Sequence, residues 1–204
     1  MEFNFFGGDL ALDLTGTLGR RYGGTPVEFL HTPDDLRRWL TAAGIADPSA
    51  ATDADDLATA KILREAVYRL AYAAMTAHSS RHTVSGDTGS TASNHAVAAG
   101  APLFDPADRA IVNQAAAVAP PLVRIDDTGA LVRSGSARAS LSLVARAAIA
   151  LVTGPSAAQL HECEGPACTR MFLDNSARGT RRWCDMSRCG NRAKVAKFRA
   201  RQPT

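Results

Sequence analysis

The sequence is poor in aromatic side chains and has no long hydrophobic stretch. Phe, Trp and Tyr make up 6% of its 204 residues, so a folded core must rely chiefly on aliphatic and small side chains. The longest run without a charge, Thr88–Phe104, is rich in Ala, Ser, Thr and Gly, a composition that does not suit a membrane span. The first residues also lack the basic start and apolar run of a signal peptide. We therefore expect a cytoplasmic protein with no membrane partner.

Sequence signatures of several enzyme classes are missing as well. The chain has no Gly-rich phosphate-binding loop, no nucleophile elbow and no redox Cys-x2-Cys motif. Asp13, His31 and Glu65 could enter a pocket, but no spacing brings the three side chains together. We therefore expect no enzymatic activity.

The histidines near the middle of the chain do not form a metal-binding pattern. They are His78, His82 and His95, and two of them fall within residues 79–100, which are rich in Ser, Thr, Gly and Ala. We interpret this segment as a flexible loop between helices. A flexible loop does not fix ligand geometry, and no cysteine or carboxylate pair accompanies the histidines.

The rest of the composition is that of an ordinary globular protein. Hydrophobic residues make up 46% and charged residues 21%, and the length fits one domain with a small additional module. The formal charge of +3 is unevenly distributed, because residues 1–160 sum to −3 and residues 161–204 to +6. A basic C-terminal segment of this kind indicates an anionic partner.

Hydrophobic periodicity predicts a mainly α-helical N-terminal domain over residues 1–155. Asp9, Thr32 and Asp105 are suitable N-cap residues, and Pro33 and Pro106 suit the first helical position. The predicted helices cover residues 10–14, 33–43, 54–77, 106–118 and 137–152. A short strand is expected over residues 27–30, and residues 122–125 and 130–133 are expected to form a small β-hairpin around a Gly-containing turn.

All four cysteines fall in the remaining segment, residues 156–204. They are arranged as Cys163-x4-Cys168, fifteen further residues, and Cys184-x4-Cys189. Two close pairs on two turns can supply the four thiolates of a structural zinc site, which leaves no open position for a catalytic water. We therefore predict one Zn²⁺ per chain. Iron, two disulfides or four unrelated buried thiols are the alternatives.

The sequence around the cysteines predicts a treble-clef-like zinc finger. Residues 170–173 and 181–183 are expected to pair as a β-hairpin, and a helix from Cys189 to Arg199 is expected to supply the last ligand. Basic residues surround these elements and suit contacts with phosphate or with guanine edges. The candidate DNA-binding residues are Arg178, Arg181, Arg182, Arg188, Asn191, Arg192, Lys194, Lys197 and Arg199.

Two of these candidates also have a local interpretation. Asn191 could contact adenine or could hydrogen-bond the backbone near its helix start. Arg192 could contact DNA or could brace the loops around the metal. The basic residues as a group could also form a solvated face without a partner.

The run Cys189-Gly190-Asn191-Arg192, preceded by Arg182-Trp183-Cys184, resembles the CGNR zinc-finger family. The segment Phe6-Gly7-Gly8-Asp9-Leu10-Ala11-Leu12-Asp13 resembles the opening of the ABATE domain, which accompanies that finger. The resemblance implies zinc binding, and it implies DNA binding in stress-induced transcription regulation. It implies no particular ligand for the helical domain.

Our hypothesis is a zinc-binding, DNA-binding transcription regulator. Its N-terminal domain is expected to sense a ligand or to form a homodimer, and its finger to bind duplex DNA. One alternative is a zinc-stabilised interaction module that binds an acidic protein partner. The other is a helical domain that binds a small molecule or acts as an enzyme.

Overall fold

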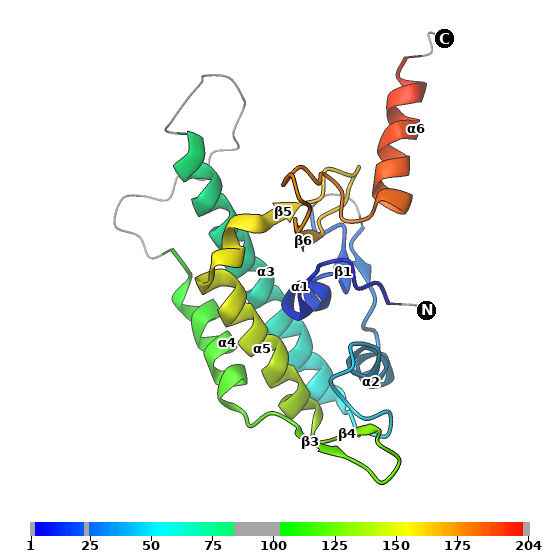
Figure 1. Cartoon of the computed structure of the whole chain (residues 1–204), viewed down its shortest axis with the longest axis vertical. Helices are drawn as coiled ribbons and strands as arrows, with labels where there is room; N and C mark the ends of the chain where they lie inside the picture. Colours follow the sequence, from blue (N-terminus) through cyan, green and yellow to red (C-terminus); the bar gives the residue numbers. More distant parts are fainter. Residues whose placement is uncertain (1–2, 23–24, 84–102, 202–204) are drawn as a thin grey trace.

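The computed structural model describes residues 3–22, 25–83 and 103–201, and its elements run through a helical body into a small C-terminal finger (Figure 1). The α-helices are α1 (Leu10–Thr15), α2 (Pro33–Ala42), α3 (Ala54–Thr83), α4 (Pro106–Ala117), α5 (Ala137–Thr153) and α6 (Asn191–Arg199). The strands are β1 (Leu18–Gly19), β2 (Val27–Glu28), β3 (Leu122–Ile125), β4 (Leu131–Ser134), β5 (Leu160–Glu162) and β6 (Met171–Leu173). A 3₁₀ turn, η1 (Pro155–Gln159), and a π turn, η2 (Met186–Gly190), complete the order.

The predicted helix starts are confirmed by their caps. The carboxylate of Asp9 accepts a hydrogen bond from the Ala11 N–H at 2.8 Å, and that of Asp105 accepts one from Ala107 at 2.7 Å. Thr32 and Asp35 form a reciprocal capping box at the start of α2. Each cap satisfies amide groups that a helix start would otherwise leave without a partner.

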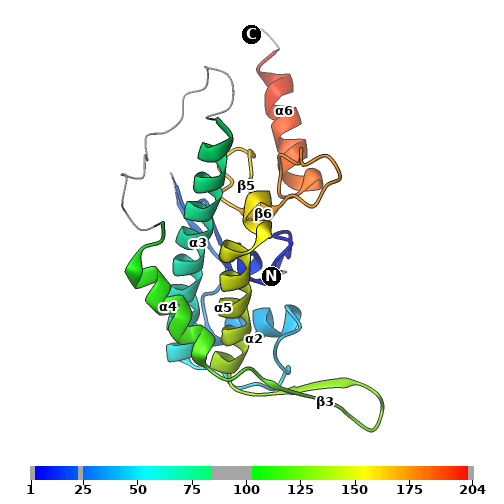
Figure 2. The same cartoon turned by 60° about the vertical axis from the view of Figure 1, so that its left-hand side comes forward.

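The body is built around three long helices that lie side by side. Figures 1 and 2 show α3, α4 and α5 packed together, with α1 against α3 and α5. The core is aliphatic, as the composition predicted. Its fully buried members include Leu12, Leu63, Val67, Leu141 and Val144, together with Trp39 from α2.

Helix α3 is longer than the sequence predicted. It continues to Thr83 instead of ending near residue 77, so the expected loop starts later than residue 79. The polar side chains in this part bond back to the helix itself. The Thr76 hydroxyl donates to the Tyr72 carbonyl at 3.1 Å, and the Ser79 hydroxyl donates to the Met75 carbonyl at 3.1 Å. The rest of the predicted loop, from residue 84 to residue 100, lies outside the described residues.

Two predicted β segments are present with shifted limits. The strand expected over residues 27–30 is reduced to Val27–Glu28, which pairs with β1. The hairpin of β3 and β4 is confirmed, with its second strand one residue later than predicted. The Asp126 carboxylate holds its turn by accepting hydrogen bonds from the Thr128 and Ala130 N–H groups, both at 2.9 Å.

The strand pairing predicted within the finger is wrong. Strand β6 pairs with β5, which precedes the first cysteine, and residues 181–183 form no strand. One hydrogen bond to a side chain and one between backbone groups hold that segment instead. The Asp174 carboxylate accepts from the Arg181 N–H at 2.7 Å, and the Arg182 carbonyl accepts from the Glu164 N–H at 2.9 Å.

Strand β6 joins the finger to the body because alternate side chains of a strand face opposite sides. Met171 and Leu173 belong to the core of the helical body, whereas Phe172 packs with the cysteines. A backbone hydrogen bond of 2.8 Å from the Leu173 N–H to the Gly7 carbonyl strengthens the join. Strand β6 is therefore one of the elements that anchor the finger to the body.

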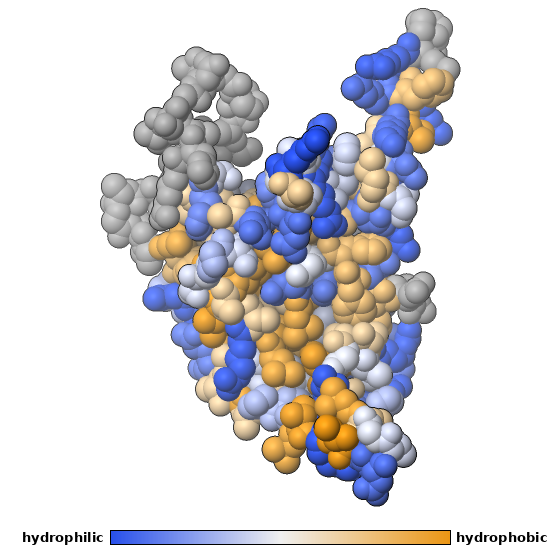
Figure 3. All heavy atoms as spheres, in the orientation of Figure 1, coloured by the Kyte–Doolittle hydropathy of each residue, from blue (hydrophilic) through white to orange (hydrophobic). Residues whose placement is uncertain are grey.

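Helix α6 and the β3–β4 hairpin extend at opposite ends of the molecule (Figure 1). No residue of α6 is buried. The hairpin carries exposed apolar side chains, which include Leu122 and Ile125. Orange atoms gather at the bottom of Figure 3, where the hairpin lies in Figure 1. Among the described residues, no helix is long and apolar enough to cross a membrane.

Candidate metal centre and basic helix

Two short loops bring the four cysteines together. Cys163 and Cys168 lie between β5 and β6, and the Cys168 N–H donates to the Gly165 carbonyl at 2.9 Å to close that turn. Cys184 precedes η2 and Cys189 lies within it. A Cβ at Gly165 would lie 2.9 Å from the Cys189 Cβ, so the first loop can approach the second this closely only with glycine.

The sulfur atoms form a cluster of the size that zinc requires. All four Sγ atoms lie within 4.8 Å of one another. The Cys168 and Cys184 sulfurs are 3.9 Å apart, and those of Cys184 and Cys189 are 3.7 Å apart. A tetrahedron with Zn–S bonds of about 2.3 Å has S–S edges of about 3.8 Å. The cysteines are free, so the disulfide alternative is not supported.

The buried sulfurs cannot all carry a charge without a cation between them. Hydrogen bonds from the Cys168 and Cys184 thiols lower the pKa of Cys163 to about 2. The same shared bonds, together with burial, raise the pKa of Cys184 far above its usual value. One thiolate is thus stabilised at the expense of its neighbours. A divalent cation removes this conflict, because four thiolates can then coexist around it.

N–H groups around the cluster suit thiolate ligands. The Gly165 and Cys184 N–H groups donate to the Cys163 Sγ at 3.4 and 3.3 Å. The Arg192 guanidinium donates to the Cys189 Sγ at 3.0 Å, which brings a positive charge against the metal centre. This direct contact supports the interpretation that Arg192 braces the loops around the metal.

Arg181 and Arg182 are both engaged within the finger. The Arg181 guanidinium donates to the carbonyls of Trp183 and Cys184, and it lies over the Phe172 ring at 4.5 Å from the centroid. Arg182 pairs with the exposed carboxylate of Glu164. These contacts connect the two cysteine loops. Arg181 is also half-buried, which limits its access to a partner.

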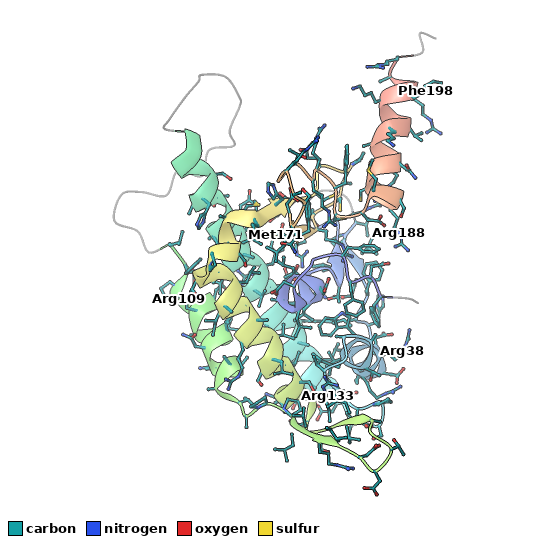
Figure 4. The ribbon with its side chains drawn as sticks, in the orientation of Figure 1. Arg38, Arg109, Arg133, Met171, Arg188 and Phe198 are labelled. Carbon is teal, nitrogen blue, oxygen red and sulfur yellow. The ribbon has the colours of Figure 1, made fainter. Side chains whose placement is uncertain are left out.

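The remaining predicted DNA-binding residues lie on the outside of the finger. The Asn191 side chain donates to the Ser187 carbonyl at 2.9 Å, as its local interpretation predicted. Arg188, at the base of α6, is labelled in Figure 4 and makes a long ion pair with Asp185 at 3.8 Å. Four others are exposed, namely Arg178, Lys194, Lys197 and Arg199.

The basic residues of α6 are distributed around the helix. Arg192 and Arg199 share one face, on which they line a shallow groove together with Arg188. Residues two positions apart differ by about 200° around a helix, so Lys194 and Lys197 lie on the opposite side. The cations therefore do not form one continuous stripe.

The other candidate site residues are placed apart from the metal centre. The Nδ1 atom of His78 lies 2.9 Å from the Ala74 carbonyl of its own helix, and His95 lies outside the described residues. Asp13 is buried and accepts a hydrogen bond from the Gly7 N–H at 2.8 Å. Glu65 pairs with Arg21 and Arg64. Within the described part of the chain, the four cysteines are the cluster that could hold a metal.

Sequence reasoning missed the side chains that join body and finger. The Arg170 guanidinium donates to the Asn4 carbonyl at 3.1 Å and to the Gly16 carbonyl at 3.0 Å. The Tyr68 hydroxyl donates to the Glu162 carboxylate at 3.3 Å, next to the first cysteine. These partners are 94 to 166 positions apart, so no local pattern in the sequence could indicate the contacts.

The fold and the cluster together define a class of protein: a helical domain joined to a structural zinc finger. The CGNR zinc-finger model matches residues 159–202, and the finger holds one zinc ion per chain. The ABATE family model, described as a putative stress-induced transcription regulator, matches residues 8–155. This match covers more than half of the chain, which therefore belongs to the ABATE family.

Both families are of regulator and zinc-finger type rather than enzyme families. No curated protein matches the chain.

Proposed function

We propose that the four cysteines ligate the zinc ion and that the finger they hold binds duplex DNA through α6. The zinc supplies a structural cross-link between the two loops, and its four thiolate ligands leave no position for a reacting water. Side chains of the finger, and not the zinc ion, then contact the DNA. Residues 1–155 and 156–204 are the two domains of this proposal.

The observation that carries the proposal is that α6 projects from the molecule with no buried residue (Figure 1). A helix of nine residues is only marginally stable in water without packing. A partner that surrounds the helix would supply the missing contacts. The major groove of DNA, roughly 12 Å wide, admits one α-helix.

The distribution of charge around α6 favours the same partner. Phosphates flank a helix in the major groove on both sides, so cations on opposite faces can each reach a strand. Lys194, Lys197 and Arg199 are exposed, and no hydrogen bond or ion pair joins them to other described residues. These three side chains are therefore available for phosphate, whereas Arg181 and Arg192 act chiefly within the finger.

The regulatory part of the proposal rests on the helical body and on the family. We propose that the body senses a ligand or pairs with a second copy, and that DNA binding by the finger regulates transcription in a stress response. A site made of reduced thiols supports a cytoplasmic location, because that compartment keeps thiols reduced. DNA binding depends on the finger alone and does not require either role of the body.

Fluorescence anisotropy with unrelated duplexes tests the proposal. Replacing Lys197 and Arg199 together with Gln should weaken binding to all duplexes alike, because phosphate contacts carry no base information. The control is Arg124→Gln, an exposed arginine of β3 at the other end of the molecule. Equal affinities for the two variants would contradict the assignment of α6 as the DNA-binding element.

An acidic protein partner remains the second candidate, because α6 also exposes apolar side chains. Val195 is 48% exposed and Phe198 is 63% exposed. A protein surface would cover both, whereas a phosphate backbone would not. No duplex binding at low salt by the zinc-loaded chain would favour this candidate.

A further inference from the structure

We propose that the cavity between the helical body and the finger binds a small organic anion with a flat apolar body, such as an aromatic carboxylate. The cavity has a volume of about 340 Å³, within the range of roughly 300–1,000 Å³ typical of ligand pockets. Its walls come from the N-terminal segment, the loop after α1, β2 and both cysteine loops. No part of this site is needed for the proposed DNA contacts of Lys194, Lys197 and Arg199.

The charged groups in the wall favour an anion. Four arginines line the cavity against one carboxylate, that of Asp185. Arg170 is held by two backbone carbonyls, and Arg192 offsets the charge of a cysteine ligand. Arg20 and Arg188 are therefore the two arginines available to bind a ligand.

One of these two cations belongs to the helical body and the other to the finger. Arg20 is exposed, lies at the end of β1 and has no hydrogen bond or ion pair with other described residues. Arg188 belongs to the finger and is 58% exposed; it makes a long ion pair with Asp185 and lies near the Phe6 ring. A carboxylate that reached both would be bound by body and finger together, and the fork of a guanidinium suits such a group.

The apolar part of the wall favours a flat ligand rather than a bare inorganic anion. Phe6, Phe29, Leu18 and Val27 all line the cavity. The Phe6 ring already lies near two guanidiniums, with Arg188 at 5.8 Å and Arg170 at 5.9 Å from its centroid. A ring or an alkyl chain would cover these side chains, while its anionic group stayed near the arginines.

Backbone strain is concentrated in the same wall. Arg20 has a φ of 53° and Ala167 a φ of 56°, and among the described residues these are the non-glycine positions with positive φ. Both residues line the cavity. A non-glycine residue in the left-handed region is strained, and such residues are found preferentially at ligand sites.

Binding of 1-naphthoate and of its neutral analogue 1-naphthamide to the zinc-loaded full chain tests the proposal, with no DNA present. Isothermal titration should give saturable binding of naphthoate at least tenfold tighter than that of the amide. Arg20→Gln should weaken naphthoate binding about tenfold. Arg124→Gln on the distant hairpin should leave it unchanged.

A second variant separates loss of the site from loss of folding. Val27→Trp fills the cavity from an exposed strand position and should abolish naphthoate binding, while zinc content and the thermal transition stay as in the parent chain. Equal affinity for naphthoate and naphthamide, or unchanged binding in both variants, would overturn the proposal. So would displacement of naphthoate by duplex DNA with a matching loss of DNA affinity in Arg20→Gln, since the cavity would then be part of the DNA surface.

Discussion

Arg192 connects the metal centre to the basic helix. It lies on the face of α6 that carries Arg199, yet its guanidinium donates to the Cys189 Sγ at 3.0 Å. The neighbouring thiol keeps the pKa of Arg192 above its usual value, so its charge is permanent. A permanent cation against a thiolate stabilises the charge of the zinc site from outside.

Replacing Arg192 with Ala should lower the affinity for zinc about 10–100-fold, the usual cost of removing a group that supports a metal ligand. Competition with a chromophoric zinc chelator measures this change. Arg199→Ala is the matched control, because that arginine lies on the same face and contacts no cysteine. If the two variants bound zinc equally well, Arg192 would have to be assigned to DNA contacts instead.

Asp13 should reduce the stability of the body at neutral pH. Burial raises its pKa to about 6 from 3.8, despite the hydrogen bond from Gly7 and the nearby charge of Arg170. The folded state therefore holds the proton more tightly than the unfolded state, so this group's contribution to stability falls as pH rises from about 4 to 6 and is constant above.

Asp13→Asn keeps an oxygen that can accept from Gly7 and removes the buried charge. The variant should gain about 1–3 kcal/mol of unfolding free energy over the parent at pH 7, and the gain should shrink towards pH 4. Denaturant unfolding of both chains across this range gives the difference. A gain that grew as the pH fell would contradict the raised pKa.

At the scale of single elements, the helices were predicted well and the finger strands were not. Caps such as Thr32 with Asp35 act locally, so their sequence pattern is sufficient to locate α2. The pairing of β5 with β6 depends on Met171 and Leu173 entering the core of the distant body. Periodicity within residues 156–204 contains no information about that core.

Strand β6 also determines which parts of the finger should lose order when zinc is removed. Chelation should expose the amides of the second cysteine loop and α6 to hydrogen exchange, because their order depends on the metal. Amides of β6 should stay protected, since Met171 and Leu173 are packed in the body core.

Hydrogen exchange monitored by mass spectrometry, with and without chelator, distinguishes these segments. The β3–β4 hairpin serves as an internal reference, because it contacts neither loop. Equal loss of protection in β6 and α6 would mean that the finger unfolds as one unit, contrary to the shared core.

At the scale of the whole molecule, the cysteine spacing was sufficient to predict the zinc site, but not how the finger sits on the body. The four clustered cysteines come from two turns, and their spacing can be read directly from the sequence. The cavity between body and finger is lined by residues from Asn4 to Arg192, and it exists only once β6, Arg170 and Gly7 have joined the two parts. Such a feature arises from tertiary structure alone.

The dependence of duplex affinity on salt, measured for the zinc-loaded and the chelated full chain, tests the central claim most directly. If zinc holds α6 in place for phosphate contacts, the zinc-loaded chain should show a log-affinity against log-salt slope of about −0.9 for each contact. Lys194, Lys197 and Arg199 would together give about −3. Chelation should lower the affinity and flatten the slope. The same affinity and slope with and without zinc, or no binding to duplex at low salt, would contradict the account.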